Sequence, residues 1–291
     1  MENYSIKDLE KLSGIKAHTI RVWERRYLIL DQHRTKTNRR RYGDSELRRI
    51  INISILHRSG FKISEIVKLT NSEIEGKVLF LSNDTFNSDN QIGALITAML
   101  SQNEKAINEL LIKSIMNRGI EDTFENIIFP FLRRIGVMWQ TGSADIGSEH
   151  FITSIFRQKL ISSIDLLPGI LNKGSRRVIL FLPENEFHEI GLLFFNYLLR
   201  KSGHETLYLG QSTPLWSVVE LNNKWNADII LTGLMSGFNN ISPDTMISQL
   251  HKSFPNQKVL VSGALADKSV IFNYPNIYKV RSANDINLLL S

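Results

Sequence analysis

Apolar residues recur at helical spacing near the start of the chain. A capping-box pattern predicts a first short helix that ends at Gly14. A second helix fits residues 17–26, with Ile20 and Trp23 on its apolar face and Glu24 outside that face. Two short helices joined by a tight glycine turn predict a helix-turn-helix.

After the second helix, the helical spacing of apolar residues is lost and then returns. Residues 33–42 have no helical period and are dense in arginine, which suits a β-ribbon wing that lies over phosphates. Asp44 is the expected cap of a longer helix through His57, and a further short helix is expected to begin at Ser64. Residues 71–90 are polar and irregular around one apolar run, which predicts a linker.

In the rest of the chain, the spacing of the apolar residues changes once. Residues 91–170 keep the helical spacing through several amphipathic segments, which predicts a small helical bundle. From about residue 174, short apolar β-like runs alternate with helical segments, which is typical of a doubly wound parallel sheet. The sequence thus predicts a multidomain chain with an all-α winged helix-turn-helix, a helical bundle and an α/β Rossmann-like (flavodoxin-like) sheet. The β-like runs are 178–182, 206–209, 229–232, 259–262 and 277–280.

Composition places the chain among ordinary globular proteins, since 42% of its 291 residues are hydrophobic and 22% are charged. Cysteine is absent, which excludes disulfides, zinc fingers, Fe–S clusters and thiolate sensors. No apolar run approaches the roughly 18 residues that a membrane span needs, and the first residues lack a signal-peptide core. We therefore expect a cytoplasmic protein without a membrane partner.

Charge is distributed unevenly along the chain. Residues 1–69 contain 16 Lys and Arg against 8 Asp and Glu, whereas the rest of the chain contains 19 against 21. The net charge of +6 therefore comes entirely from the first domain. Such asymmetry is expected when one domain binds a polyanion, although charge alone fits a solvated basic face equally well.

The loop after the first predicted strand carries candidate metal chemistry, because ligands of parallel sheets bind beyond the carboxyl ends of the strands. A neutral imidazole at His188 suits a transition metal, and Glu186 can accept the other ring N–H. Gly191 lets a bulky ligand approach the backbone. For this loop alone, a surface histidine with acidic neighbours is the simpler interpretation.

The first domain closely resembles the DNA-binding domain of MerR-family regulators. The resemblance covers about residues 3–70 and is carried in order by residues 19–27, 38–42 and 60–66, with Asn38-Arg39 where the family has Gly-Tyr. It implies that the second helix enters the major groove and that the wing holds phosphates. The residues implied to bind DNA are Thr19, Arg21, Trp23, Arg25, Arg39, Arg40, Arg41 and Tyr42.

The loops of the last domain resemble the cobalamin-binding fold of methionine synthase and the base-off mutases. That family carries Asp/Glu-x-His-x-x-Gly, then Ser-x-Leu or a Thr variant, then Gly-Gly. Glu186 to Gly191 satisfies the first element. The resemblance implies that His188 is the lower axial ligand of cobalt and that Glu186 is its hydrogen-bond partner.

The same resemblance extends to the later strand ends. Thr232 stands at the Ser position with Leu234 after it, so its hydroxyl is expected to face the displaced nucleotide tail. Ser262 and Gly263 replace the Gly-Gly pair, which adds a hydroxymethyl group where the tail packs.

The bundle carries a further signature. Trp139, nine intervening residues and then Glu149-His150 match the pattern of light-sensing, cobalamin-dependent MerR regulators of the CarH/LitR group. The resemblance implies that Trp139 and Glu149 shield a 5′-deoxyadenosyl upper ligand, which suits an aromatic face and a carboxylate. Gln140 stands where some relatives have a second cobalt-binding histidine, so a stable two-histidine photoproduct is not expected.

Together the resemblances imply a transcriptional regulator, by family expectation a repressor, that binds a double-stranded DNA operator. Its cofactor is expected to be cobalamin, as adenosylcobalamin or methylcobalamin. The cofactor is expected to control assembly into a dimer or tetramer and hence operator occupancy, with a light response in the family pattern. The expected parts are a DNA-binding domain 1–72, a linker 73–90, a bundle 91–172 and a cobalamin-binding domain 173–291.

Two alternatives stay open. In the first, the cobalamin domain is degenerate and binds a protein partner, which Gln140 and Ser262 favour slightly. In the second, the chain is a corrinoid-carrying methyltransferase subunit, which explains residues 91–291 but leaves the DNA-reading segment without a purpose. No Ser/His/Asp order, Walker loop or paired-histidine metal motif is seen in the sequence, so the chain is not expected to be an enzyme.

Overall fold

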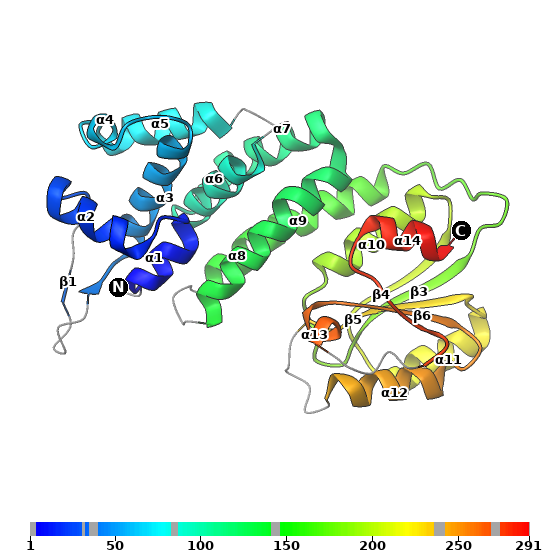
Figure 1. Ribbon diagram of the computed structural model, residues 1–291. Helices are drawn as coiled ribbons and strands as arrows, with labels where there is room; N and C mark the ends of the chain where they lie inside the picture. Colours follow the sequence, from blue (N-terminus) through cyan, green and yellow to red (C-terminus); the bar gives the residue numbers. More distant parts are fainter. Residues whose placement is uncertain are drawn as a thin grey trace. The chain divides into compact units, whose positions relative to one another are not determined.

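The chain divides into two compact units, residues 1–155 and 156–291, and each is described by itself. The computed structural model, drawn in Figure 1, describes the residues given at the end of this paragraph. Within these residues, no helix has the length and apolar character that a membrane crossing demands. The described residues are 4–30, 33–34, 40–82, 87–140, 146–235, 242–268 and 274–290.

Unit 1 begins with two short helices and a two-stranded ribbon. Helix α1 (Ile6–Ser13) starts at a capping box and ends at Gly14, whose φ of 77° is left-handed. Helix α2 (Ala17–Tyr27) follows after a short turn. Strands β1 (His33–Arg34) and β2 (Arg40–Arg41) then pair antiparallel. The predicted helix-turn-helix and its ribbon wing are therefore present.

The next helix, α3 (Asp44–Arg58), corrects a detail of the prediction. Its N-cap is Gly43 rather than Asp44, because the Glu46 carboxylate accepts the Gly43 N–H at 2.9 Å. The short helix expected from Ser64 is the single turn α4 (Ile63–Ile66).

The irregular chain predicted after residue 70 is wrong over most of its length. Residues 71–82 form helix α5 (Asn71–Ser82). The helix starts at a reciprocal cap, in which Thr70 N–H donates to the Glu73 carboxylate at 2.7 Å and Glu73 N–H donates to the Thr70 hydroxyl at 3.3 Å. This cap satisfies backbone groups that a polar linker would leave to water.

The predicted helical bundle is confirmed. Helix α7 contains a break at Gly119, whose φ of 84° and ψ of 170° are open to glycine alone, and a π-helical turn follows it. The helices are α6 (Ser88–Leu100), α7 (Glu104–Thr123), η1 (Phe124–Ile128), α8 (Phe129–Gln140) and α9 (Ile146–Asp165).

The helix-turn-helix packs directly on this bundle within unit 1. Helices α3 and α6 approach closely at Gly93, where an added Cβ would lie 2.6 Å from Cδ1 of Ile55. Beside this contact the Thr97 hydroxyl donates to the side-chain oxygen of Asn52 at 3.0 Å. Arg134 of α8 donates to the carbonyl of Leu12 in α1.

Unit 2 contains the predicted parallel sheet. Its strand order is β4-β3-β5-β6-β7, and every neighbouring pair runs parallel. This order reverses between β3 and β5, as in flavodoxin-like folds, and ligands of such folds bind at that switch point. The strands are β3 (Arg177–Pro183), β4 (Glu205–Thr213), β5 (Ile229–Gly233), β6 (Lys258–Ser262) and β7 (Ile277–Lys279).

Helices cover both faces of this sheet, with α10 and α14 on one face and α11 and α12 on the other (Figure 1). Helical segments alternate with these strands as predicted, but the short helix α13 was not expected from the sequence. The helices are α10 (Ile190–Lys201), α11 (Leu215–Trp225), α12 (Pro243–Ser253), α13 (Ala264–Lys268) and α14 (Ala283–Leu290).

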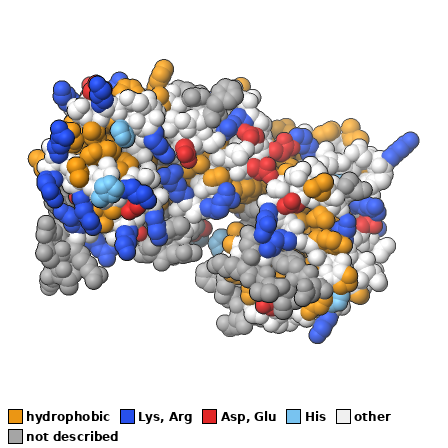
Figure 2. All heavy atoms as spheres, in the orientation of Figure 1, with side chains coloured by type: hydrophobic (Ala, Val, Ile, Leu, Met, Phe, Trp, Pro, Cys, Tyr) orange, Lys and Arg blue, Asp and Glu red, His pale blue; other side chains and the backbone are white. Residues whose placement is uncertain are grey.

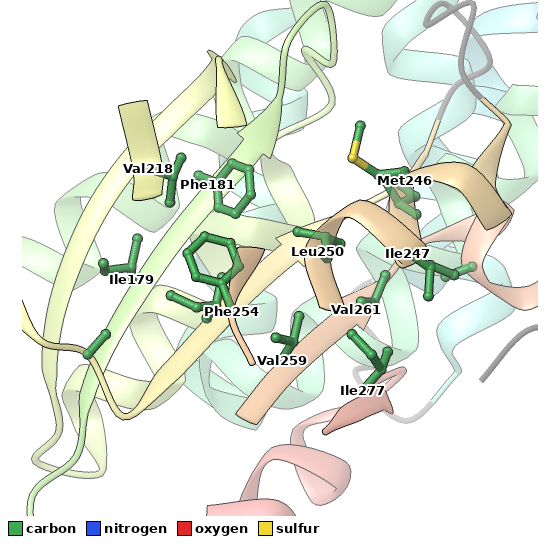
Figure 3. Packing of buried hydrophobic residues seen from close by; sticks show 14 residues of the cluster. Ile179, Phe181, Val218, Met246, Ile247, Leu250, Phe254, Val259, Val261 and Ile277 are labelled. Carbon is green, nitrogen blue, oxygen red and sulfur yellow. The ribbon is translucent and has the colours of Figure 1, made fainter. Parts of the chain in front are cut away.

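The core beneath α11 and α12 follows from the alternation of strand side chains. Ile179 and Phe181 on β3, like Val259 and Val261 on β6, point to the same side and meet Leu250 of α12 (Figure 3). All five side chains are buried. The sheet is thus a rigid base from whose strand ends the loops extend.

Candidate functional site

The loop between β3 and α10 lies at the switch point of the sheet, and strand β4 holds it from one side. Asn185 N–H donates to the Ser212 hydroxyl at 3.0 Å, and Ser212 N–H donates to the Glu186 carbonyl at 3.1 Å. The Gln211 amide donates to the Phe187 carbonyl at 2.9 Å. The loop is therefore fixed at three successive residues.

Glu186 and His188 form a pair at the tip of this loop. The Nδ1 atom of His188 lies 2.7 Å from Oε1 of Glu186, while Oε2 of Glu186 accepts the Met235 N–H at 3.1 Å. Glu186 is buried, but the His188 side chain is 40% exposed. An ionised carboxylate only accepts hydrogen bonds, so the pair favours the tautomer with the proton on Nδ1. This leaves Nε2 as the ring atom suited to a metal.

The ends of β5 and β6 bring the other predicted residues of unit 2 together. Ser262 donates its hydroxyl to the Thr232 carbonyl at 3.3 Å, and Leu234 N–H donates to the Ser262 carbonyl at 2.8 Å. At Gly263, φ is 106° and an added Cβ would lie 2.4 Å from the Leu234 carbonyl oxygen, so only glycine fits. At Gly191, in the first turn of α10, an added Cβ would meet open space.

Thr232 carries an unpartnered polar atom. The residue is 0% exposed, and its hydroxyl oxygen has no hydrogen-bond partner among the described residues. Burying a hydroxyl without a partner costs about 1–3 kcal/mol, so such groups are uncommon and each needs an explanation. The hydroxyl lies near the end of β5, and its contact with a nucleotide tail stays a prediction.

A second carboxylate of the loop was missed by sequence reasoning. Glu189 is buried at 5% exposure; it accepts the Tyr208 hydroxyl at 2.7 Å and pairs with Nε of Arg157 at 2.6 Å. Burial, and then the hydrogen bond to Glu189, raise the pKa of Tyr208 above its ordinary value, so the hydroxyl stays a donor. The partners are distant in sequence, and only the first of them lies on a strand.

The residues of unit 1 that are predicted to bind DNA differ in how far they are exposed to solvent. Arg21 and Arg25 of α2 are exposed, and Thr19 is half-buried. Arg40 and Arg41 of β2 are half-buried, whereas Arg39 lies outside the described residues. Figure 2 shows many Lys and Arg side chains over the helices of unit 1 in this view. This distribution suits a surface that meets phosphates.

Trp23 and Tyr42 are buried instead. Trp23 packs edge-on against His57 with ring centroids 5.3 Å apart, and the Tyr42 hydroxyl donates to the Glu24 carboxylate at 2.6 Å. Glu24, placed outside the apolar face by its helical spacing, is buried as well and lies 3.8 Å from Nε of Arg40. Glu24 therefore joins α2 to Arg40 and Tyr42 at the end of the wing, whereas Trp23 packs on α3. Contact of Trp23 or Tyr42 with DNA stays a prediction.

The residues predicted to shield the upper ligand lie on two bundle helices of unit 1. Trp139 is near the end of α8, and its side chain is outside the described part of the chain. Glu149, half-buried, and His150, exposed, are in the first turns of α9. Their association with His188, which belongs to unit 2, stays a prediction.

Comparison with known proteins assigns a class to two segments of the chain. Residues 4–73 match the MerR HTH family regulatory proteins, and residues 91–161 match the B12 binding domain. The chain therefore combines a DNA-binding domain of the MerR regulator type with a B12-binding domain.

Whole proteins with a similar sequence are repressors of Myxococcus xanthus. The chain is 27% identical to the HTH-type transcriptional repressor CarH over 72% of either chain. It is 24% identical to the HTH-type transcriptional repressor CarA over 72% of this chain and 68% of that one. Among solved structures, the monomethylamine corrinoid protein of Methanosarcina barkeri is 14% identical over 76% of this chain and 99% of that one, with a TM-score of 0.47. The chain is thus a distant relative of CarH and CarA.

Proposed function

We propose that this protein is a transcriptional repressor whose oligomerisation and operator binding are controlled by bound cobalamin. The observation that carries the proposal is the Glu186–His188 pair at the switch point of the sheet. A single imidazole supplies one ligand, which fits a metal that brings its other ligands in a macrocycle. The carboxylate behind it fixes the ring, as is common for histidine ligands of metals.

The residues present fit cobalamin. His188 would bind cobalt through Nε2, and the unpartnered Thr232 hydroxyl would bond the nucleotide tail. Gly263 keeps the backbone of the neighbouring strand ends close together, so no side chain intrudes between them. When bound, cobalamin supplies a cobalt centre with an exchangeable upper ligand, and its form, adenosylcobalamin or methylcobalamin, decides that ligand.

The bundle residues extend this proposal. Trp139 and Glu149 would shield the upper ligand, with His150 beside them, and Gln140 replaces the histidine that some relatives carry. Illumination of adenosylcobalamin-loaded protein is therefore expected to remove the upper ligand without leaving a two-histidine complex. The measurement is the absorption spectrum in darkness and after illumination. A bis-imidazole spectrum after illumination would contradict this part.

The central test replaces Thr232 and His188 separately. Thr232→Val removes an unpartnered hydroxyl, so it is expected to stabilise the cofactor-free protein by about 1 kcal/mol and to weaken cobalamin binding. His188→Ala is expected to abolish axial ligation. Thr123→Val is the matched control, because that buried hydroxyl donates to the Gly119 carbonyl at 2.7 Å and its loss is expected to destabilise by about 1 kcal/mol.

Three measurements test cobalamin binding, operator binding and oligomerisation separately. Purified wild-type protein that stays colourless after incubation with adenosylcobalamin contradicts the proposal and favours a degenerate domain. Operator binding is tested with Arg21→Ala, which is expected to weaken binding to a double-stranded DNA selected from a random pool. Light scattering with and without cobalamin tests whether the cofactor controls a dimer or a tetramer.

A further inference from the structure

The buried carboxylate of Glu189 directly follows the proposed cobalt ligand in sequence. A buried charge is tolerated only when it is paired and hydrogen-bonded, and Glu189 has partners from two other elements. The Tyr208 hydroxyl donates to Oε2 at 2.7 Å, and Nε of Arg157 lies 2.6 Å from Oε1. We call Arg157, Glu189 and Tyr208 the loop clamp.

A bulge in strand β4 lies next to Tyr208, the residue that donates to the Glu189 carboxylate. Leu180 pairs with Tyr208, but the next pairing is Phe181 with Gly210, so Leu209 is an extra residue. Such a bulge redirects the neighbouring side chains of a strand. Gly210 adopts φ of 76°, which other residues rarely adopt. The irregularity thus lies directly beside the hydroxyl that holds Glu189.

Arg157 comes from a helix with another predicted role. It lies on α9, two turns after Glu149 and therefore about 12 Å further along the same helix. Helix α9 thus carries a residue predicted to shield the upper face of the cofactor and a residue that holds the loop of the lower ligand.

We infer that the loop clamp is a positioning network, which fixes the orientation of His188 and ties the lower-ligand loop to helix α9. The inference rests on the proposed cobalamin site. None of the three side chains needs to touch the cofactor. They position the loop through Glu189, which is next to His188 and is the N-cap residue of α10. Because its side chain is held by Arg157 and Tyr208, the path of the loop is held as well. A movement of α9 would then reach the His188 loop through the Arg157–Glu189 ion pair.

The test uses the full chain and two readouts. Tyr208→Phe removes one hydroxyl, Glu189→Gln keeps an acceptor but removes the charge, and Arg157→Gln breaks the ion pair while Arg157→Lys restores it. Tyr278→Phe is the matched control, because that hydroxyl donates to the Pro275 carbonyl at the far edge of the sheet. Hydrogen exchange of residues 184–190 is measured without cofactor. Nitrogen coupling in the paramagnetic resonance spectrum of cobalt(II)-loaded protein reports the axial imidazole.

Tyr208→Phe and Arg157→Gln are expected to speed exchange of residues 184–190 roughly tenfold and to lower cobalamin affinity roughly tenfold to a hundredfold. Exchange in strands β5 and β6 is expected to stay unchanged, which shows that the sheet is folded. Arg157→Lys is expected to recover most of both losses. Tyr278→Phe is expected to behave as wild type.

Failure of the clamp differs from failure of the cobalamin proposal. If wild-type protein binds cobalamin and the Tyr208 and Arg157 variants keep wild-type exchange and axial nitrogen coupling, the clamp is wrong and the cofactor stands. If wild-type protein binds no cobalamin but residues 184–190 exchange faster in these variants, the clamp positions the loop and the cofactor proposal fails.

Discussion

Replacement of Gly93 by alanine tests how tightly the DNA-reading domain is joined to the bundle. Gly93 lies where α6 crosses α3, and an added Cβ would lie 2.6 Å from Cδ1 and 3.1 Å from Cγ1 of Ile55. It would also lie 3.6 Å from Cγ2 of Ile51, an ordinary contact. Both isoleucines are fully buried, so the new methyl group must displace the end of the Ile55 side chain.

Two opposing effects determine how much Gly93→Ala changes the stability of unit 1. Overpacking of this kind costs about 1–3 kcal/mol, whereas alanine is better than glycine in a helix interior by about 1 kcal/mol. Gly93→Ala is therefore expected to destabilise unit 1 by about 0–2 kcal/mol. Gly136→Ala on α8 separates the effects, because an added Cβ there meets nothing within 4 Å and should stabilise by about 1 kcal/mol. The difference between the two substitutions isolates the overpacking.

The assay is native-state hydrogen exchange of α3 and α6 in the full chain, since a multidomain chain does not unfold in two states. Ile55→Val removes the atom that the new methyl group would strike and alone costs about 0.5–1.5 kcal/mol. In the double variant the two losses should therefore be less than additive, by about 1 kcal/mol. The reasoning is refuted if Gly93→Ala stabilises as Gly136→Ala does, or if the two substitutions are additive.

Three further predictions follow from single interactions. Tyr42→Phe removes the donor from buried Glu24 and should lower the stability of unit 1 by about 1–3 kcal/mol, measured by native-state hydrogen exchange of α2, while Val22→Ala on the exposed side of α2 should leave it unchanged. Burial, and then Arg176, lower the pKa of His204, so the unfolded state binds more protons. The stability of unit 2 should therefore fall as pH drops below about 6.5, and His204→Asn should reduce that dependence in native-state hydrogen exchange of β3 and β4. Gly119→Ala forces a side chain into left-handed backbone and should destabilise the bundle by more than 1 kcal/mol, against stabilisation by Gly76→Ala on the exposed surface of α5.

The α/β unit could be predicted closely because its signals are local. The β-like runs 229–232 and 259–262 lie within one residue of strands β5 and β6. Helix α5 was missed because residues 71–82 lack amphipathic spacing, although the Thr70–Glu73 capping pair was a readable signal. Where a helix is specified by its cap rather than by an apolar face, periodicity does not identify it.

The residues of the candidate site also divide into those that local sequence patterns identify and those that they do not. Glu186 and His188 are two residues apart, and Thr232 is placed by the rule that ligands bind beyond strand ends, so the sequence identified all three as candidates. The partners of Glu189 depend on a bulge in β4 and on a helix of the preceding segment, which no local pattern encodes. Glu24 was misplaced because helical spacing describes one helix alone, whereas the wing covers its outer side.

The packing within unit 1 also bears on how a bundle signal could reach DNA. Arg134 of α8 donates to the Leu12 carbonyl, two residues before the Gly14 turn that leads into α2, and burial lowers the pKa of its guanidinium below the ordinary value. Trp139, the proposed cover of the upper ligand, lies on the same helix. A shift of α8 therefore displaces a contact of the helix-turn-helix itself. Because α3 and α6 are in direct contact as well, we expect the described helices of the helix-turn-helix to move together with those of the bundle.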